Sequence, residues 1–181
     1  MSNKCIALVA LIFILCSCSS PEARRPKTHT TSNFYKEVIA ENIKLNNLEK
    51  SHIESFLKKD TVNNFLSSPK GFWYAYNVKD TLNSMKPVKG DVVTLSYNIS
   101  NLYNTTIYKD QTISYKVDKE DFIPALQDGI KLMKKGETIT FVIPSYRAFG
   151  VTGDGSKIGM NQTLKSRLTL IDIKKLNNEI N

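Results

Sequence analysis

Few residues of the types that usually perform covalent or metal chemistry occur in this sequence. Its 181 residues include two histidines, His29 and His52, and three cysteines, all within the first 18 positions. A metal site built on several histidines is therefore disfavoured, and a Ser-His-Asp or Cys-His arrangement would have to use one of these two imidazoles. We expect no metal and no other cofactor.

Two polar patterns suggest chemistry at first sight. Gly153-Asp154-Gly155-Ser156-Lys157 contains residue types of a phosphate-binding loop. No Gly-Lys-Ser/Thr sequence opens a helix after it, so the pattern favours a hairpin turn. Asp121 and Asp128 belong to one predicted helix, where we interpret them as charges favourable to the helix dipole rather than as an acid-base pair.

The cysteines indicate a lipid anchor rather than a disulfide framework. Lys4 precedes an apolar run of ten residues, Ile6 to Leu15, which is shorter than the roughly 20 residues that span a bilayer. This pattern predicts a signal peptide over residues 1–17. Leu15-Cys16-Ser17-Cys18 resembles the bacterial lipobox, so Cys18 is expected to be the lipidated first residue of the mature chain. Ordinary secretory cleavage that leaves a spare thiol is the alternative.

The remaining composition is that of a soluble globular chain with an appendage. The chain is 41% hydrophobic and 23% charged, which disfavours disordered and polytopic membrane classes. Lysine supplies 21 of the 25 basic residues and is scattered without aromatic interleaving, so the net charge of +8 predicts no nucleic-acid partner.

We interpret residues 18–33 as a flexible tether, which consists of the lipidated cysteine and a Ser-, Thr- and Pro-rich stretch. Because no Asp follows Cys18, we expect the outer membrane.

A helical segment is predicted over residues 34–70. Its apolar residues fall on two stripes, which indicates two short helices. Asn46 followed by Glu49 suits a capping box at the start of the second helix. The segment either forms a coiled coil or, as is commoner at this length, packs against the following domain. His52 falls on the exposed side of its stripe and is expected at the surface.

Strand patterns begin after Gly71. Between residues 92 and 99, Val92, Thr94, Ser96 and Asn98 alternate with Val93, Leu95, Tyr97 and Ile99. Further strands are predicted at residues 72–78, near 105–108, and at 112–117, 138–143 and 163–173. One helix interrupts them, with Pro124 in its first turn and Gly136 as its left-handed C-terminal cap. The sequence therefore predicts an α+β fold in which an antiparallel half-barrel sheet wraps one central helix.

Four motifs in this region, in this order and spacing, resemble the FKBP-type peptidyl-prolyl isomerases. They are Gly90-Asp91-Val92-Val93-Thr94-Leu95-Ser96-Tyr97, Phe122-Ile123-Pro124-Ala125-Leu126-Gln127-Asp128-Gly129, Leu132-Met133-Lys134-Lys135-Gly136-Glu137 and Ile143-Pro144-Ser145-Tyr146-Arg147-Ala148-Phe149-Gly150. The resemblance covers roughly half of the chain, from about Lys86 to Leu176. It implies an FKBP-like fold over residues 71–181, preceded by the short N-terminal helices.

The resemblance also implies a reaction that needs neither nucleophile nor metal, the rotation of an X-Pro amide in a dry apolar pocket. The positions that match the family's pocket walls are Tyr97, Ile107, Phe122, Ile123, Ala148, Phe149 and Ile158. In the family, a backbone N–H at the helix entry, here near Ile123, binds the substrate carbonyl. Leu126 takes the place of the Trp that usually forms the pocket floor.

Other positions depart from the family's pattern. Tyr108 replaces a usual Asp, Phe149 replaces a usual Tyr, and Ser166 stands where an aromatic residue is expected. These departures keep two functions open. One is a lipid-anchored isomerase that assists folding of exported proteins, and the other is a non-catalytic binding or structural lipoprotein of a motility or secretion apparatus.

The upstream segment supports a narrower resemblance. Asn42, Leu45, Asn46 and Glu49, with Gly71-Phe72-Trp73-Tyr74-Ala75-Tyr76, are similar to the gliding-motility-associated isomerase lipoproteins of Bacteroidota. The partners that this implies are proline-containing client polypeptides and, through the lipid, a membrane. A monomer is expected.

Overall fold

The computed structural model describes residues 31–81 and 85–175. The predicted signal peptide, Cys18 and most of the predicted tether lie outside these residues. The chain divides into two compact units, residues 1–39 and 40–181. The described part of the first unit is helical, and the second unit contains the sheet and the site described below.

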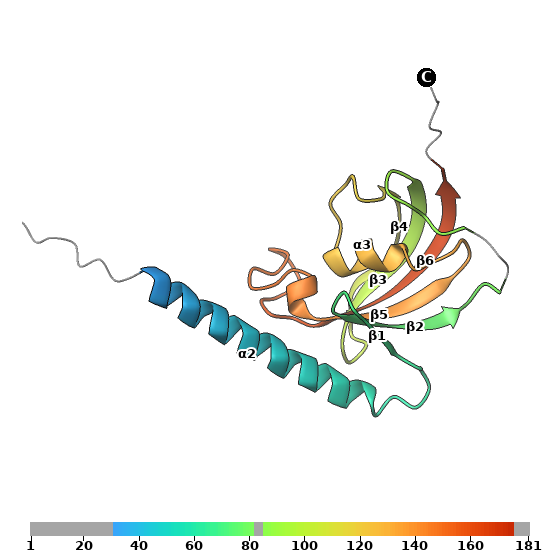
Figure 1. Ribbon diagram of the computed structural model, residues 1–181. Helices are drawn as coiled ribbons and strands as arrows, with labels where there is room; N and C mark the ends of the chain where they lie inside the picture. The colour runs from blue at the N-terminus through green and yellow to red at the C-terminus, as the bar shows by residue number, and fades with distance from the viewer. Residues whose placement is uncertain (1–30, 82–84, 176–181) are drawn as a thin grey trace, which may run out of the picture. The chain divides into compact units, whose positions relative to one another are not determined.

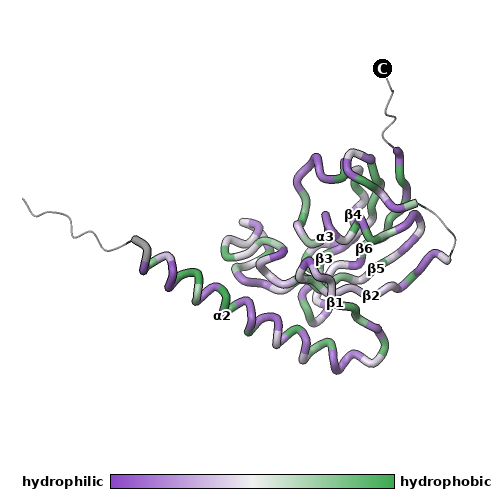
Figure 2. Tube along the Cα trace, viewed as in Figure 1, coloured by the Kyte–Doolittle hydropathy of each residue, from purple (hydrophilic) through white to green (hydrophobic). Residues whose placement is uncertain are grey.

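One long helix replaces the two short helices predicted for the N-terminal segment. Helix α2 runs from Thr31 to Leu57 without a break. The segment contains no Gly or Pro that would interrupt it. The predicted capping box is therefore wrong, because Asn46 and Glu49 lie inside the helix. Hydrophobic and hydrophilic stretches alternate along α2 (Figure 2).

The C-terminal part of α2 belongs to the second unit and packs on the sheet domain within it, which is one of the two alternatives predicted. Ile53 is fully buried and forms a small core with Trp73, Leu102 and Val142. His52 is exposed, as predicted. No helix among residues 31–81 and 85–175 combines the length and apolar character needed to cross a membrane.

Six antiparallel strands form one sheet in the order β1-β2-β5-β6-β3-β4 (Figure 1). The strands are β1 (Leu66–Ser68), β2 (Phe72–Val78), β3 (Val92–Asn101), β4 (Thr106–Lys116), β5 (Thr138–Ile143) and β6 (Leu164–Lys174). The alternation predicted for β3 is confirmed, because Val93, Leu95, Tyr97 and Ile99 are all buried. β4 is a single strand where two short strands were predicted. Its pairing with β3 continues across two register shifts, so the chain stays in the sheet.

A short helix lies against one face of this sheet. Helix α3 runs from Pro124 to Ile130, with Pro124 in its first turn as predicted. It packs closely on β5, since Gly129 leaves no room for a side chain beside the Phe141 ring. The predicted cap at Gly136 is wrong, because the helix ends earlier. Gly136, with a φ of 85°, forms the turn before β5 instead. The α+β half-barrel is confirmed.

Candidate active site

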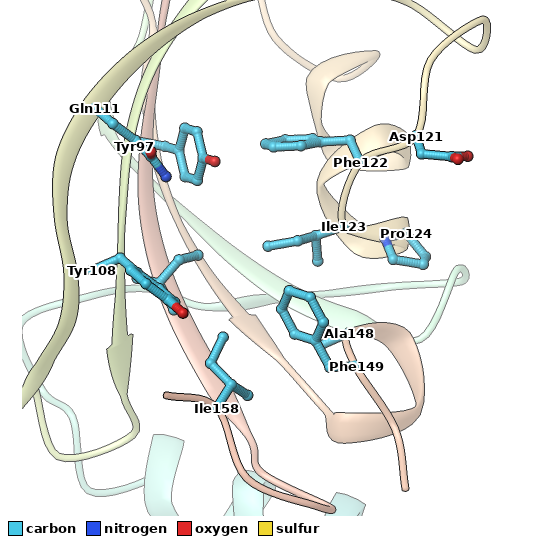
Figure 3. Close-up of a pocket in the computed structure, with 11 residues that line it drawn as sticks. Tyr97, Tyr108, Gln111, Asp121, Phe122, Ile123, Pro124, Ala148, Phe149 and Ile158 are labelled. Carbon is cyan, nitrogen blue, oxygen red and sulfur yellow. The ribbon is translucent and has the colours of Figure 1, made fainter. Parts of the chain in front are cut away.

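A cavity of about 510 Å³ opens between the start of α3, strands β3 and β4, and the loop that connects β5 to β6 (Figure 3). Its lining is mostly apolar and aromatic. The lining residues are Tyr97, Ile99, Tyr108, Gln111, Asp121, Phe122, Ile123, Pro124, Ala148, Phe149 and Ile158. A volume of this size is in the range of about 300–1,000 Å³ that holds a small organic group.

Two aromatic rings form the wall between the sheet and the helix. Tyr97 points inward because it is on the buried face of β3, and the Phe122 ring meets it edge-on with centroids 5.1 Å apart. Burial raises the pKa of Tyr97, and a hydrogen bond with the Gln111 side chain opposes this rise. The Tyr97 hydroxyl is therefore protonated at neutral pH and available to donate a hydrogen bond.

The opposite wall comes from the helix entry and from a turn after β5. Ile123 is the N-cap residue of α3 and is 8% exposed. A 3₁₀ turn over Ser145–Arg147 leads into Ala148 and Phe149. Arg147 Nη2 donates a 2.6 Å hydrogen bond to Asp128 Oδ2, which ties this turn to α3. The helix-dipole interpretation of Asp121 and Asp128 is wrong, because Asp121 precedes α3 and Asp128 lies towards its C-terminal end. Asp128 instead forms an ion pair that holds the pocket wall.

A hydrogen bond between two distant segments closes the lower side of the pocket. The Tyr108 hydroxyl on β4 donates to Asp154 Oδ2. Asp154 Oδ1 accepts the backbone N–H groups of Ser156 and Ile158, at 2.9 and 2.8 Å, and so shapes the loop that carries Ile158. The Tyr108 hydrogen bond is the main reason that the pKa of Asp154 lies below its ordinary value. Gly153–Lys157 forms a turn and a bend within the connection between β5 and β6, and no strand borders it directly, so the predicted hairpin turn is wrong.

Six of the eight residues that the sequence predicted line this one cavity, namely Tyr97, Phe122, Ile123, Ala148, Phe149 and Ile158. The other two do not line it. Ile107 is partly buried and packs on the core, and Leu126 is fully buried in the core. Ser166 is also fully buried, and its Oγ donates a 2.7 Å hydrogen bond to the carbonyl oxygen of Asn98.

Sequence reasoning missed five lining residues as wall positions: Ile99, Tyr108, Gln111, Asp121 and Pro124. Ile99 could have been found, because it shares the buried face of β3 with Tyr97. Gln111 could not, because its position opposite Tyr97 depends on the register between β3 and β4. Among residues 31–81 and 85–175, no cluster of three or more His, Cys, Asp or Glu side chains could hold a metal ion.

This geometry suits the binding of a compact apolar group. Its walls are hydrocarbon and aromatic surface, while the Tyr97 hydroxyl and the Gln111 amide supply a few polar contacts. The Asp121 carboxylate points away from the cavity (Figure 3). Such a site binds through exclusion of water and a small number of oriented hydrogen bonds.

Comparison with known proteins agrees with this geometry. The family description that matches is "FKBP-type peptidyl-prolyl cis-trans isomerase", over residues 83–171. A protein of Neisseria meningitidis named as a probable FKBP-type isomerase, FkpA, is 29% identical over 123 residues, which are 66% of this chain and 44% of that protein. Outer membrane protein MIP of Legionella longbeachae is 29% identical over 104 residues, which are 55% and 44% of the two chains. The matched part of this chain thus spans less than half the length of these curated relatives.

Solved structures show the same fold. The crystal structure of FkpA from Escherichia coli superimposes with a TM-score of 0.58 at 20% identity, over 96% of this chain and 83% of that one. The fold, the family match and the cavity at the motifs agree. Residues 83–171 of this chain therefore belong to the FKBP-type peptidyl-prolyl cis-trans isomerase family.

Proposed function

We propose that the cavity binds the prolyl residue of a polypeptide and accelerates cis-trans rotation of the bond that precedes it. The observation that supports this most directly is the open apolar hollow between α3 and the sheet, which the protein's own side chains leave unfilled. Tyr97, Phe122, Ile123, Ala148, Phe149 and Ile158 contact the prolyl ring in this proposal. Ile107 and Leu126 act only by packing behind these walls.

The physical basis of the acceleration is the loss of amide resonance during rotation. The barrier of about 18–20 kcal/mol reflects the partial double bond between carbon and nitrogen. A twisted amide is less polar than a planar one, so a pocket that removes water favours the transition state over the ground state. The apolar walls supply this environment without a nucleophile.

Two departures from the family's pattern have structural counterparts. Phe149 has no hydroxyl to offer a substrate, which removes a contact worth about 0.5–1.5 kcal/mol. Tyr108 brings a hydroxyl to the pocket's edge, but this group donates to Asp154 and orders the loop. We therefore propose that Tyr108 and Asp154 together order the pocket, as the resemblance attributes to an Asp at position 108.

The assay of function measures cis-trans rotation of the X-Pro bond in short peptides, with several residues in place of X. A coupled protease that cleaves only one isomer reports the rate. The purified full-length chain is expected to accelerate the rotation above the rate in buffer, and Tyr97→Ala is expected to remove most of that acceleration. Tyr103→Ala is the matched control, because Tyr103 is a 67% exposed tyrosine in the turn that follows β3. Wild-type rates equal to buffer for every peptide would favour the non-catalytic binding protein.

We further propose that the protein acts as a monomer tethered to the outer membrane through lipid on Cys18, with exported or gliding-motility proteins as clients. The lipobox pattern and the name of the relative from Legionella longbeachae, an outer membrane protein, support the location. Cys18→Ala is expected to move the protein from the membrane fraction to the soluble fraction. Cys5→Ala, within the predicted signal peptide, is the control and is expected to leave the protein with the membrane.

A further inference from the structure

The Glu49 carboxylate of α2 holds both ends of the loop that forms one side of the cavity. Glu49 Oε1 accepts the backbone N–H of Ser145 at 2.7 Å, and Glu49 Oε2 accepts the Ser145 hydroxyl at 2.7 Å. Glu49 Oε1 also accepts the Thr163 hydroxyl at 2.5 Å. These two partners are 18 residues apart in sequence and flank the connection between β5 and β6.

The connection held in this way carries a large part of the cavity lining. Ala148, Phe149 and Ile158 all lie between Ser145 and Thr163, as does Asp154, the partner of Tyr108. After the 3₁₀ turn this stretch contains no helix or strand before β6 begins. Its position therefore depends on a small number of hydrogen bonds rather than on a continuous ladder.

Ion pairs and hydrogen bonds from three different elements help to hold the loop. Arg147 pairs with Asp128 of α3, Asp154 pairs with Tyr108 of β4, and the two ends bind Glu49 of α2. The first two attachments are within the region matched to the family, and the third comes from outside it. Hydrogen bonds to an ionised carboxylate are stronger than those between neutral groups.

Removal of the carboxylate would leave buried donors without partners. Ser145 is 5% exposed, so its N–H and hydroxyl have little access to replacement water. Its carbonyl oxygen accepts the N–H groups of Ala148 and Gly150, at 2.9 and 2.8 Å, and therefore transmits its position to the pocket wall. The Glu49 charge is also close to Tyr146. Burial is the main cause that raises the pKa of Tyr146, and the Glu49 charge raises it further.

We infer that Glu49 is a positioning residue for the proposed isomerase site, through which helix α2 sets the placement of Ala148, Phe149 and Ile158. This inference rests on the proposed function. In this inference, the helix upstream of the family-matched residues affects the rate of isomerisation, although Glu49 does not contact the substrate. The loop keeps its fold without the carboxylate but samples a wider range of positions.

The test compares full-length variants in the X-Pro peptide assay. The assay temperature is one at which urea unfolding curves show that each variant is fully folded without urea. Glu49→Ala is expected to lower kcat/KM about tenfold, because small misplacement of binding groups has large effects on rate. Glu49→Gln keeps one accepting oxygen, and we expect it to recover part of the loss. Glu41→Ala is the matched control, since Glu41 is an exposed carboxylate on the same helix that pairs with Lys44 at 3.8 Å. It is expected to leave kcat/KM unchanged.

A second variant and a second readout separate positioning from a general loss of stability. Thr163→Val is expected to lower kcat/KM about threefold alone and to add little to Glu49→Ala, because both remove the same contact. Amide hydrogen exchange is expected to speed up in Glu49→Ala at Gly150 and Asn161, whose N–H groups donate within the loop. Exchange in β3 should stay as in the wild type.

The outcomes distinguish this inference from the proposed function. An active wild type with Glu49→Ala at the wild-type kcat/KM overturns the inference alone. Faster exchange throughout the sheet, with activity lost in proportion to the unfolded fraction, also overturns it, because Glu49 would then be only structural. An inactive wild type overturns the proposed function and this inference together.

Discussion

A single methyl group added at Gly129 should disturb the packing of α3 on β5, which supports the cavity. A Cβ atom at this position would lie 2.5 Å from Cε1 and 2.7 Å from Cζ of Phe141. Ordinary contact begins at 3.4 Å, so the ring or the helix has to move by about 1 Å. Phe141 is fully buried on β5 and has little room to move. Gly129→Ala should therefore push α3 away from the sheet.

The expected sign is opposite to the usual effect of this substitution. In an exposed helix, replacement of Gly by Ala stabilises by up to about 1 kcal/mol. Overpacking of a dense core costs about 1–3 kcal/mol. We expect a net destabilisation of about 1–2 kcal/mol, together with lower activity, because Ile123 at the start of the same helix lines the cavity.

Urea unfolding followed by tryptophan fluorescence measures this effect. The chain has a single tryptophan, Trp73, which is 6% exposed and pairs with Val142 of β5. With a slope of about 2 kcal/mol per M urea, the midpoint should fall by about 0.5–1 M. In a Phe141→Leu background the same Gly129→Ala change should cost much less, because the smaller side chain relieves the contact. A midpoint that is unchanged or higher in Gly129→Ala would refute the close packing of α3 on β5.

Two further predictions concern the cavity directly. Phe149→Ala should lower kcat/KM at least tenfold but cost only about 1 kcal/mol of stability, because the ring is only partly buried. Val78→Ala, at an exposed strand end, is the control. Equal activity of the two variants would contradict the role of Phe149. The Tyr108 hydroxyl lowers the pKa of Asp154 from its ordinary 3.8. The contribution of this contact to the free energy of unfolding is therefore present above pH 3.8 and is lost as the pH falls through the lower native pKa. NMR titration of the Asp154 carboxyl should therefore show its pKa rising toward 3.8 in Tyr108→Phe, and an unchanged titration would show that the hydroxyl does not perturb it.

The strand patterns predicted the sheet because strand alternation is a property of local sequence, and the spacing of the motifs predicted most of the cavity. Alternation along β3 placed Tyr97 correctly, since successive side chains of a strand point to opposite faces. The spacing of the FKBP-type motifs then brought Tyr97, Ile123 and Phe149 to one cavity. These residues belong to different elements, and no periodicity within one element relates them.

The errors arose where a tertiary contact decides between local alternatives. Asn46 and Glu49 fit a helix start in sequence, yet Glu49 is inside α2 and its carboxylate binds Ser145 and Thr163. The pairing of Tyr108 with Asp154 joins residues 46 positions apart, and no local pattern predicts it. Leu126 was expected on the cavity floor, but its side chain is enclosed in the core.

The arrangement of β1 and β2 determines where this protein can be shortened. Both strands precede the family-matched residues 83–171, yet β2 covers one edge of β5. Every residue of β5 is buried, and its sequence, Thr-Ile-Thr-Phe-Val-Ile, has high β-propensity and no charge. A truncated chain that began at the family boundary would expose this edge to other chains, which favours intermolecular strand pairing and insoluble aggregates. The smallest unit that keeps this edge of β5 covered therefore begins upstream of β2.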